Sequence, residues 1–337
     1  MSAIFVEDLS KQFPREPRPA VDHVSFQADD GAFVVLLGPS GCGKTTLLKM
    51  INRLYEPTSG RILIGGTEVH DLPVTDLRRR IGYVIQQVGL FPHMRIEQNI
   101  AVVPELLGWD RRRIDERIDE LLDLIGLPRT YRKRYPRQLS GGEQQRIGLA
   151  RALAADPAIM LMDEPFGAID AITRARLQDE LASIQQKLRK TIMFVTHDVE
   201  EALRLADKII IMRTGTIVQY DTPLGIITRP HDKFVRDLTG ADDILRRLSL
   251  ISVREALAAR ATGNGVVTTP STPSAATLNL DADLREALSR LLGSGAESLP
   301  VIGPAGERLG ELSLENLRAF SIRAEGVVGR QDDKMTR

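Results

Sequence analysis

Three short segments of the chain carry residues that could bind a phosphate group and cleave it. Residues 38–45 have the sequence GPSGCGKT, which matches the phosphate-loop pattern G-x-x-x-x-G-K-[ST]. Residues 139–146 have the sequence LSGGEQQR, and an apolar run over residues 159–162 ends in two carboxylates, Asp163 and Glu164. A glycine-rich loop with a lysine, together with paired acids, supplies the groups that phosphoryl transfer uses. The sequence therefore predicts a site that binds and hydrolyses a nucleotide.

The phosphate loop lies between a candidate buried strand at Phe33–Leu37 and a helix expected over Thr45–Leu54. In that setting the backbone amides at the start of the helix point at a bound anion. Lys44 would bridge the β- and γ-phosphates, and Thr45 would hold Mg²⁺ through its hydroxyl. A chance glycine-rich turn is the alternative, and the strand–loop–helix order argues against it. The candidate phosphate-binding residues are Gly38, Pro39, Ser40, Gly41, Cys42, Gly43, Lys44, Thr45 and Thr46.

In this order the three motifs resemble those of the ATP-binding-cassette family. The resemblance implies an α/β P-loop NTPase with a RecA-like core sheet and a helical subdomain at about residues 88–155, within a nucleotide-binding domain over residues 1–240. In the family, LSGGQ-type sequences act across a dimer. Ser140, Gly141 and Gly142 would then contact the γ-phosphate held by Lys44 of a partner chain. The implied cofactors are ATP and Mg²⁺, and the implied assembly is a homodimer.

The resemblance also implies roles for residues beyond the loop. Asp163 would bind Mg²⁺, and Glu164 would act as the general base toward the attacking water. His197 matches the switch histidine that contacts the γ-phosphate, although a single histidine at a strand end is more often structural. Asp170 falls in the segment that contacts the opposite subunit.

Two further positions are assigned by the same resemblance. Gln86 and Gln87 compete for the glutamine that senses Mg²⁺ and water, and alignment of the following LFPH sequence favours Gln86 as the catalytic and metal-contacting residue. Phe13 resembles the aromatic residue that stacks on adenine, although most aromatic residues belong to a core. For Cys42 the simpler explanation is likewise structural: a small side chain that fills space in the phosphate loop.

Composition limits the alternatives. The 337 residues carry 45 basic and 45 acidic side chains, so no nucleic-acid partner is expected, and the arginine runs at 78–80 and 111–113 have acidic neighbours. One cysteine excludes an intrachain disulfide and favours a reducing compartment. Neither a signal peptide nor a membrane-spanning run is recognisable. We expect a peripheral protein on the cytoplasmic face of the inner (plasma) membrane.

The C-terminal part predicts a second, smaller α+β domain over residues 241–322. A Thr/Ser/Pro-rich stretch at 262–277 suggests a linker, and Asp281–Asp283 could cap a following helix. A hairpin is expected over residues 298–312, followed by a helix over Leu314–Phe320. This order resembles a single CBS module, but Asn316 stands where adenosyl-binding modules have Asp. Residues 323–337 are expected to be a disordered tail.

Several segments outside the ATP motifs resemble the osmoprotectant-importer branch of the cassette family. They include LKMINRL at 48–54, IGYVIQQ at 81–87 and GLFPH at 89–93. The branch takes up glycine betaine, choline or carnitine, and its partners are an integral-membrane permease and an extracytoplasmic substrate-binding protein. Import of another small solute, such as an amino acid, is the alternative. DNA-repair cassettes contain long coiled coils, and no sustained heptad run occurs here.

Overall fold

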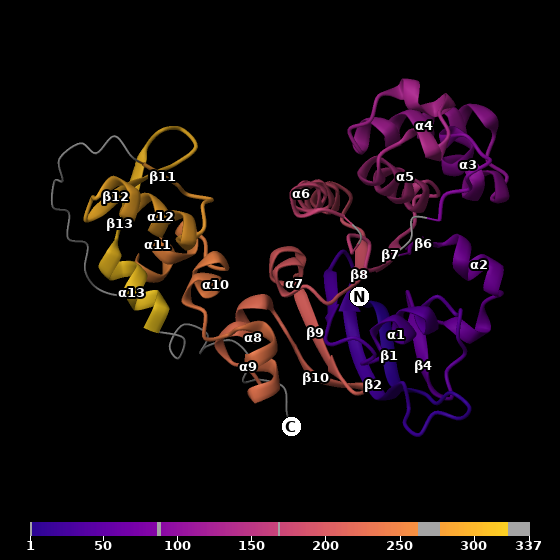
Figure 1. Cartoon of the computed structure of the whole chain (residues 1–337), viewed down its shortest axis with the longest axis horizontal. Helices are drawn as coiled ribbons and strands as arrows, with labels where there is room; N and C mark the ends of the chain where they lie inside the picture. The colour runs from indigo at the N-terminus through magenta and orange to yellow at the C-terminus, as the bar shows by residue number, and fades with distance from the viewer. Residues whose placement is uncertain (1, 86–88, 168, 262–276, 323–337) are drawn as a thin grey trace. The chain divides into compact units, whose positions relative to one another are not determined.

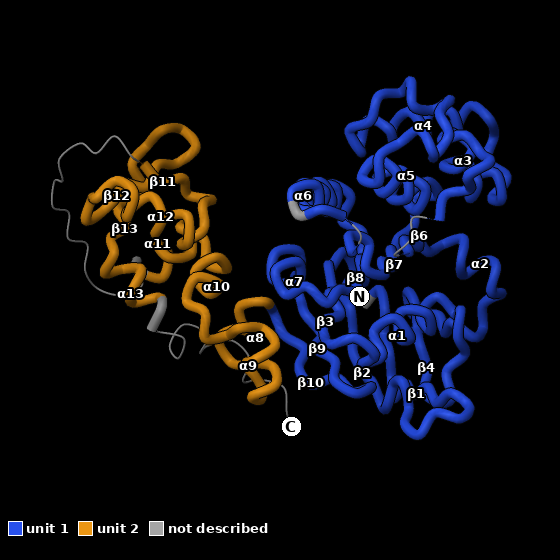
Figure 2. The backbone as a smooth tube through the Cα atoms, in the orientation of Figure 1, with its two compact units in different colours: residues 1–222 blue, residues 223–337 orange. Residues whose placement is uncertain are grey.

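The computed structural model describes residues 2–85, 89–167, 169–261 and 277–322, which form two compact units (Figures 1 and 2). The first unit is Met1–Thr222 and the second is Pro223–Arg337. The division precedes the domain boundary expected at residue 240, because α8 (Pro223–Thr228) packs on α9 (Lys233–Thr239) and α10 (Ile244–Ser249). The expected tail and all but the last residue of the expected linker lie outside the described residues.

A six-stranded sheet with the order β10-β9-β3-β8-β7-β6 forms the centre of the first unit. All neighbouring strands are parallel except β10, which pairs antiparallel with β9. Strands β3 and β8 are buried along their whole length and are apolar except for the threonines at the two ends of β8, as expected for parallel strands covered on both faces. The predicted α/β core is therefore confirmed. In sheet order the strands are β10 (Thr216–Asp221), β9 (Lys208–Arg213), β3 (Phe33–Leu37), β8 (Thr191–Thr196), β7 (Ile159–Asp163) and β6 (Ile81–Val84).

A second, antiparallel sheet in this unit has the strand order β2-β1-β4-β5. Sequence reasoning did not predict this sheet. The phosphate loop and its flanking elements separate β1 from β4 in the sequence, and pairing between such distant segments leaves no local signature. Buried and exposed residues alternate along much of β2, as expected for a strand with one covered face. The strands are β2 (Val21–Asp29), β1 (Ser2–Lys11), β4 (Ser59–Ile64) and β5 (Thr67–Glu68).

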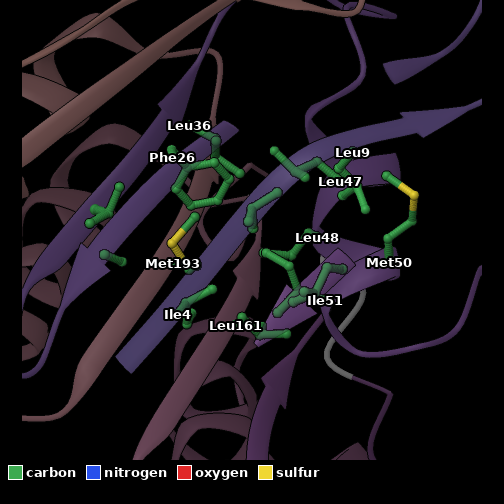
Figure 3. Packing of buried hydrophobic residues seen from close by; sticks show 14 of the residues in the cluster. Ile4, Leu9, Phe26, Leu36, Leu47, Leu48, Met50, Ile51, Leu161 and Met193 are labelled. Atoms are coloured by element: carbon green, nitrogen blue, oxygen red, sulfur yellow. The ribbon is translucent and has the colours of Figure 1, made fainter. Parts of the chain in front are cut away.

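Helix α1 (Lys44–Ile51) joins the two sheets through one hydrophobic core. Figure 3 shows its apolar side chains packed among those of strands from both sheets. Because α1 begins at the end of the phosphate loop, this core also fixes the position of the loop. The labelled core residues are Ile4, Leu9, Phe26, Leu36, Leu47, Leu48, Met50, Ile51, Leu161 and Met193.

Helices α3, α4 and α5 form a separate group within the first unit (Figure 1). Helix α4 buries one apolar face, with Ile114, Ile118, Leu121 and Leu122 recurring at helical spacing, and its N-cap Asp110 accepts a hydrogen bond from the Arg113 amide. No helix in the described ranges is both long enough and apolar enough to span a bilayer. The remaining helical elements of the unit are η1 (Val69–Asp71), α2 (Val74–Arg79), α3 (Ile96–Leu106), α4 (Arg111–Leu124), η2 (Arg129–Lys133), η3 (Pro136–Gln138), α5 (Gly141–Leu153), α6 (Ala171–Leu188) and α7 (Val199–Leu205).

The second unit contains a small three-stranded sheet, β11-β12-β13, and the helices that cover it. The predicted hairpin is confirmed, since β12 and β13 pair antiparallel. Asp283 caps α12 by accepting a hydrogen bond from the Glu286 amide at 2.7 Å, as the sequence suggested. These elements are α11 (Val253–Ala261), β11 (Leu278–Asn279), α12 (Leu284–Ser294), β12 (Ser298–Ile302), β13 (Arg308–Ser313) and α13 (Leu314–Ile322).

Two adjacent leucines on α12 provide a matched test of this core. Leu291 is 1% exposed within the core, whereas Leu292 is 66% exposed. We expect Leu291→Ala to lower the free energy of unfolding of the second unit by about 2–5 kcal/mol, because it leaves a cavity. We expect Leu292→Ala to change it by less than about 0.5 kcal/mol. Hydrogen exchange of the α12 amides measures both, and equal protection in the two variants would contradict the packing described.

Candidate functional site

The phosphate loop connects β3 to α1 and depends on two close backbone approaches. A Cβ atom at Gly38 would lie 2.4 Å from the Met212 carbonyl oxygen, and one at Gly43 would lie 2.3 Å from the Ala20 carbonyl oxygen. Gly43 also has a φ of 107°, in the left-handed region that favours glycine. No other residue fits at either position, so Gly38 and Gly43 are structural requirements of the loop itself.

Lys44 is held over this loop rather than extended into solvent. Its side chain is buried, and its Nζ donates hydrogen bonds to the carbonyl oxygens of Gly38 (2.7 Å) and Pro39 (3.0 Å). Lysine carries three such donors and a point charge. The loop therefore presents a fixed positive charge beside the backbone amides at the start of α1, an arrangement that suits a phosphate chain.

Thr45 and Asp163 meet next to the loop, although they are far apart in the sequence. The Thr45 hydroxyl donates a hydrogen bond to Asp163 Oδ1 at 2.8 Å. Burial raises the pKa of Asp163, and the hydrogen bond from Thr45 and the charge of Lys49 act in the opposite direction. A hydroxyl beside a carboxylate is the kind of oxygen ligand pair that Mg²⁺ prefers. The residues present therefore fit the metal that the resemblance implies.

Glu164 and His197 come from the ends of neighbouring strands and face each other. His197 Nδ1 lies 3.2 Å from Glu164 Oε2. The Glu164 amide donates a hydrogen bond to the Val195 carbonyl oxygen at 3.0 Å, which ties the end of β7 to β8. Glu164 has a φ of 44°, an uncommon value for a residue other than glycine and one that concentrates at functional sites. An acid and an imidazole are thus positioned together at the edge where the phosphate loop begins.

A groove of about 500 Å³ lies beside the phosphate loop and has Phe13 in its lining. Gly41 of the loop contributes to the same lining, as do Arg18 and Ala20. The Phe13 ring is held edge-to-face against Tyr55, with ring centroids 5.4 Å apart. The groove has room for a planar base against Phe13, next to the loop that would hold the phosphates.

The LSGGEQQR segment begins α5, with Ser140 as its N-cap. The Ser140 amide donates to Glu143 Oε2 at 2.7 Å, while the Tyr131 hydroxyl donates to Glu143 Oε1 at 2.8 Å. These bonds lower the pKa of Glu143, the Ser140 amide most strongly. Figure 1 shows α5 beside α3 and α4 and apart from α1, so one chain does not bring this segment to its own phosphate loop.

The other predicted site residues have different outcomes. Asp170 caps α6 by accepting a hydrogen bond from the Thr173 amide at 3.0 Å, and this bond lowers the pKa of Asp170. Gln86 and Gln87 lie outside the described residues. Sequence reasoning missed Tyr131, because nothing local marks a tyrosine that reaches the segment from a preceding turn.

Cys42 is 3% exposed, and its Sγ lies 3.8 Å from Lys44 Nζ. Burial raises the pKa of the Cys42 thiol, and the charge of Lys44 opposes this only in part. The thiolate is the reactive form, so the raised pKa makes it scarce near neutral pH.

We therefore expect a maleimide to modify Cys42 slowly, at a rate that rises as the pH approaches the raised pKa. Modification should abolish ATPase activity by blocking the loop, and ATP should protect the thiol. Intact-protein mass measured alongside activity tests this, with Cys42→Ala as the unlabelled control. Full activity in completely modified protein would refute the expectation.

The strand-end acids, the glycine loop and the nucleotide-sized groove together define a P-loop ATPase. Comparison with known proteins agrees, since the family model described as "ABC transporter" matches residues 21–167. The chain belongs to the ABC transporter family, in which it is an ATP-binding subunit.

Two curated relatives match nearly the whole chain. It is 48% identical to the glycine betaine uptake system ATP-binding protein YehX of Escherichia coli (strain K12), over 88% of this chain and 94% of the relative. It is 49% identical to the osmoprotectant import ATP-binding protein OsmV of Salmonella typhimurium (strain LT2), over 98% of this chain and 86% of the relative.

A solved structure is also similar to the chain. It is the dimeric post-hydrolysis state of the ATP-binding cassette MJ0796 bound to ADP and Pi, with 31% identity and a TM-score of 0.59. The similarity covers 65% of this chain and 98% of the MJ0796 chain. About a third of this chain therefore lies outside the similarity.

Proposed function

We propose that this chain is the ATP-hydrolysing subunit of a bacterial importer that takes up a quaternary-ammonium osmoprotectant such as glycine betaine. The observation that carries the enzymatic part is the pairing of Glu164 with His197 beside the Thr45–Asp163 pair. The substrate class rests on the named relatives, which match 88% and 98% of the chain. Import of a different small solute is the alternative.

Lys44 and the loop amides would bind the β- and γ-phosphates of ATP, and Phe13 would support the adenine ring. Thr45 and Asp163 would hold Mg²⁺, together with Gln86. The metal would neutralise negative charge on the phosphate oxygens when bound. The hydrogen bond between Thr45 and Asp163 supports this assignment, because it places both oxygen ligands side by side beside Lys44.

Glu164 would accept the proton of the attacking water as the general base. His197 would contact the γ-phosphate, and its 3.2 Å contact with Glu164 would help to orient the carboxylate at the strand edge. Water attacks the γ-phosphorus, the bond to the bridging oxygen breaks, and ADP and phosphate leave. Transient proton transfer to Glu164 balances the step.

A head-to-tail homodimer would complete each site, since the LSGGEQQR segment lies apart from the phosphate loop of its own chain. Ser140, Gly141 and Gly142 of one subunit would donate hydrogen bonds to the γ-phosphate bound by the other. Asp170 would lie at the same interface. ATP binding would close the dimer and hydrolysis would reopen it.

The remaining assignments follow from the importer function. An integral-membrane permease and an extracytoplasmic binding protein would be the partners, with this subunit peripheral on the cytoplasmic face of the inner membrane. Residues 241–322, within the second unit, would form a CBS-type module that pairs with a second copy or responds to ionic strength. Asn316 stands where adenosyl-binding modules have Asp, and the absence of that carboxylate favours a module without a bound nucleotide; its side-chain oxygen accepts a hydrogen bond from the Ser313 amide at 3.0 Å.

We expect Glu164→Gln to form a stable ATP-bound dimer with negligible turnover, because the amide cannot accept the proton from water. Size-exclusion chromatography with saturating ATP and a phosphate-release assay measure the two properties. Glu116→Gln, an exposed glutamate on α4, should hydrolyse ATP normally and provides the matched control. A Glu164→Gln variant that stays monomeric would contradict the dimer model.

Glycine betaine uptake tests the transport assignment in a host without other betaine systems. We expect Lys44→Ala to abolish uptake, because the fixed charge at the phosphates is lost. Lys187→Ala, which removes an exposed lysine from α6, should leave uptake unchanged. Normal uptake in the Lys44→Ala strain would show that this chain does not energise betaine uptake, and import of a different small solute would then be the better hypothesis.

A further inference from the structure

Arg174 connects two segments that flank the catalytic pair. This residue lies on the first turn of α6, directly after the segment that follows Glu164. Its Nη2 donates a hydrogen bond to the Ile169 carbonyl oxygen at 2.9 Å, and its Nη1 donates one to Asp198 Oδ2 at 3.5 Å. One guanidinium group therefore joins the segment after Glu164 to the residue that follows His197.

Asp198 is itself firmly positioned. Its Oδ1 accepts hydrogen bonds from the amides of Glu200 (2.9 Å) and Glu201 (3.4 Å), which makes it the N-cap of α7. Its own amide donates a hydrogen bond to Thr196 Oγ1 at 3.0 Å. The residues on both sides of His197 are thus bonded to each other, and the histidine projects from a constrained turn.

A second link between α6 and this turn is fully buried. The Thr196 hydroxyl donates to Glu201 Oε2 at 2.6 Å, and Gln178 Nε2 donates to Glu201 Oε1 at 3.0 Å. All three side chains are buried. Hydrogen bonds in such a low-dielectric setting are costly to break, so this link stabilises the packing of α7 on α6.

The link through Arg174 is more exposed and longer than the buried link, so it is poorly suited to stabilising the fold. The Arg174 and Asp198 side chains are 29% and 32% exposed, and their contact is long. Arg174 Nε is buried without a hydrogen-bond partner among the described residues, which is a cost to stability. Arg174 and Gln178 are one turn apart on the same face of α6, yet only the arginine also bonds the segment at residue 169.

We propose that Arg174 is a positioning residue that transmits the placement of Ile169 to the turn that carries His197, and so to the contact of His197 with Glu164. The inference rests on the proposed roles of Glu164 and His197. A shift of Ile169, in the segment that would face the second subunit, would move the guanidinium relative to Asp198 and so change the contact that supports the turn carrying His197. The catalytic contact would then be correctly set only when the neighbouring subunit holds that segment in place.

The test is a double-mutant cycle on the full chain, with Arg174→Ala, Asp198→Asn and both together. Asp198→Asn keeps an oxygen that can cap α7 but removes the charge that Arg174 contacts. We expect each single variant to lower kcat about tenfold while KM for ATP changes less than about twofold, the pattern of an interaction needed only for the chemical step. The double variant should be no slower than the slower single variant, because both remove the same link.

Arg176→Ala is the matched control, since Arg176 lies on the same helix with its side chain 63% exposed, and it should keep normal kcat. Thermal unfolding separates folding from positioning, and Arg174→Lys, which retains the charge without the two-armed geometry, should recover only part of kcat. Multiplicative losses in the double variant, or losses that appear as raised KM with lowered Tm, would overturn the inference. So would normal kcat in both single variants.

Wild type and Lys44→Ala are assayed in the same series. A wild type no faster than Lys44→Ala would refute the proposed hydrolytic function itself. Normal wild-type turnover with unaffected Arg174 and Asp198 variants would refute only the role assigned to Arg174.

Discussion

The parallel pairing of β3, β8 and β7 is the constraint on which the site depends. In this register Leu37 lies opposite Thr196, and Asp163 lies opposite Val195. Parallel strands end at the same edge of a sheet, and open α/β sheets bind ligands at the carboxyl ends of their strands. The phosphate loop, the two acids and His197 each follow one of these three strands. Their convergence is therefore a consequence of strand order and needs no separate explanation.

The core around α1 makes this edge rigid. Apolar side chains of α1 pack between the two sheets, so the helix that starts at Lys44 cannot shift without opening the core (Figure 3). The close approaches of Gly38 to Met212 and of Gly43 to Ala20 attach the loop to its neighbours at backbone level. A site that stabilises charge electrostatically benefits from such preorganisation, because its dipoles need no reorientation when charge develops.

In contrast to α1, the helical group α3–α5 lies apart from the phosphate loop. Its Ser140 is held by Glu143 and Tyr131 in a locally complete cap, independent of the nucleotide-binding edge. In the proposed head-to-tail homodimer, the LSGGEQQR segment would serve the phosphate loop of the other chain, which would couple catalysis to the association of two chains. Arg174 extends this logic inside one chain, since it joins the segment at Ile169 to the turn that carries His197.

The sequence alone determined the chemistry and much of the local structure. The order of glycines, lysine and acids predicted the phosphate loop and its flanking strand and helix, because these depend on backbone conformation and on neighbours in the chain. The amphipathic helix α4, the cap at Asp283 and the β12–β13 hairpin were predictable for the same reason. Only the tertiary structure decided the pairing of β1 with β4, the meeting of Thr45 with Asp163 and of Glu164 with His197, and the bonds of Tyr131 and Arg174. Each of these joins residues that are distant in sequence or lie on different elements, so the packing of the sheets and helices, rather than any local pattern, selects the partners.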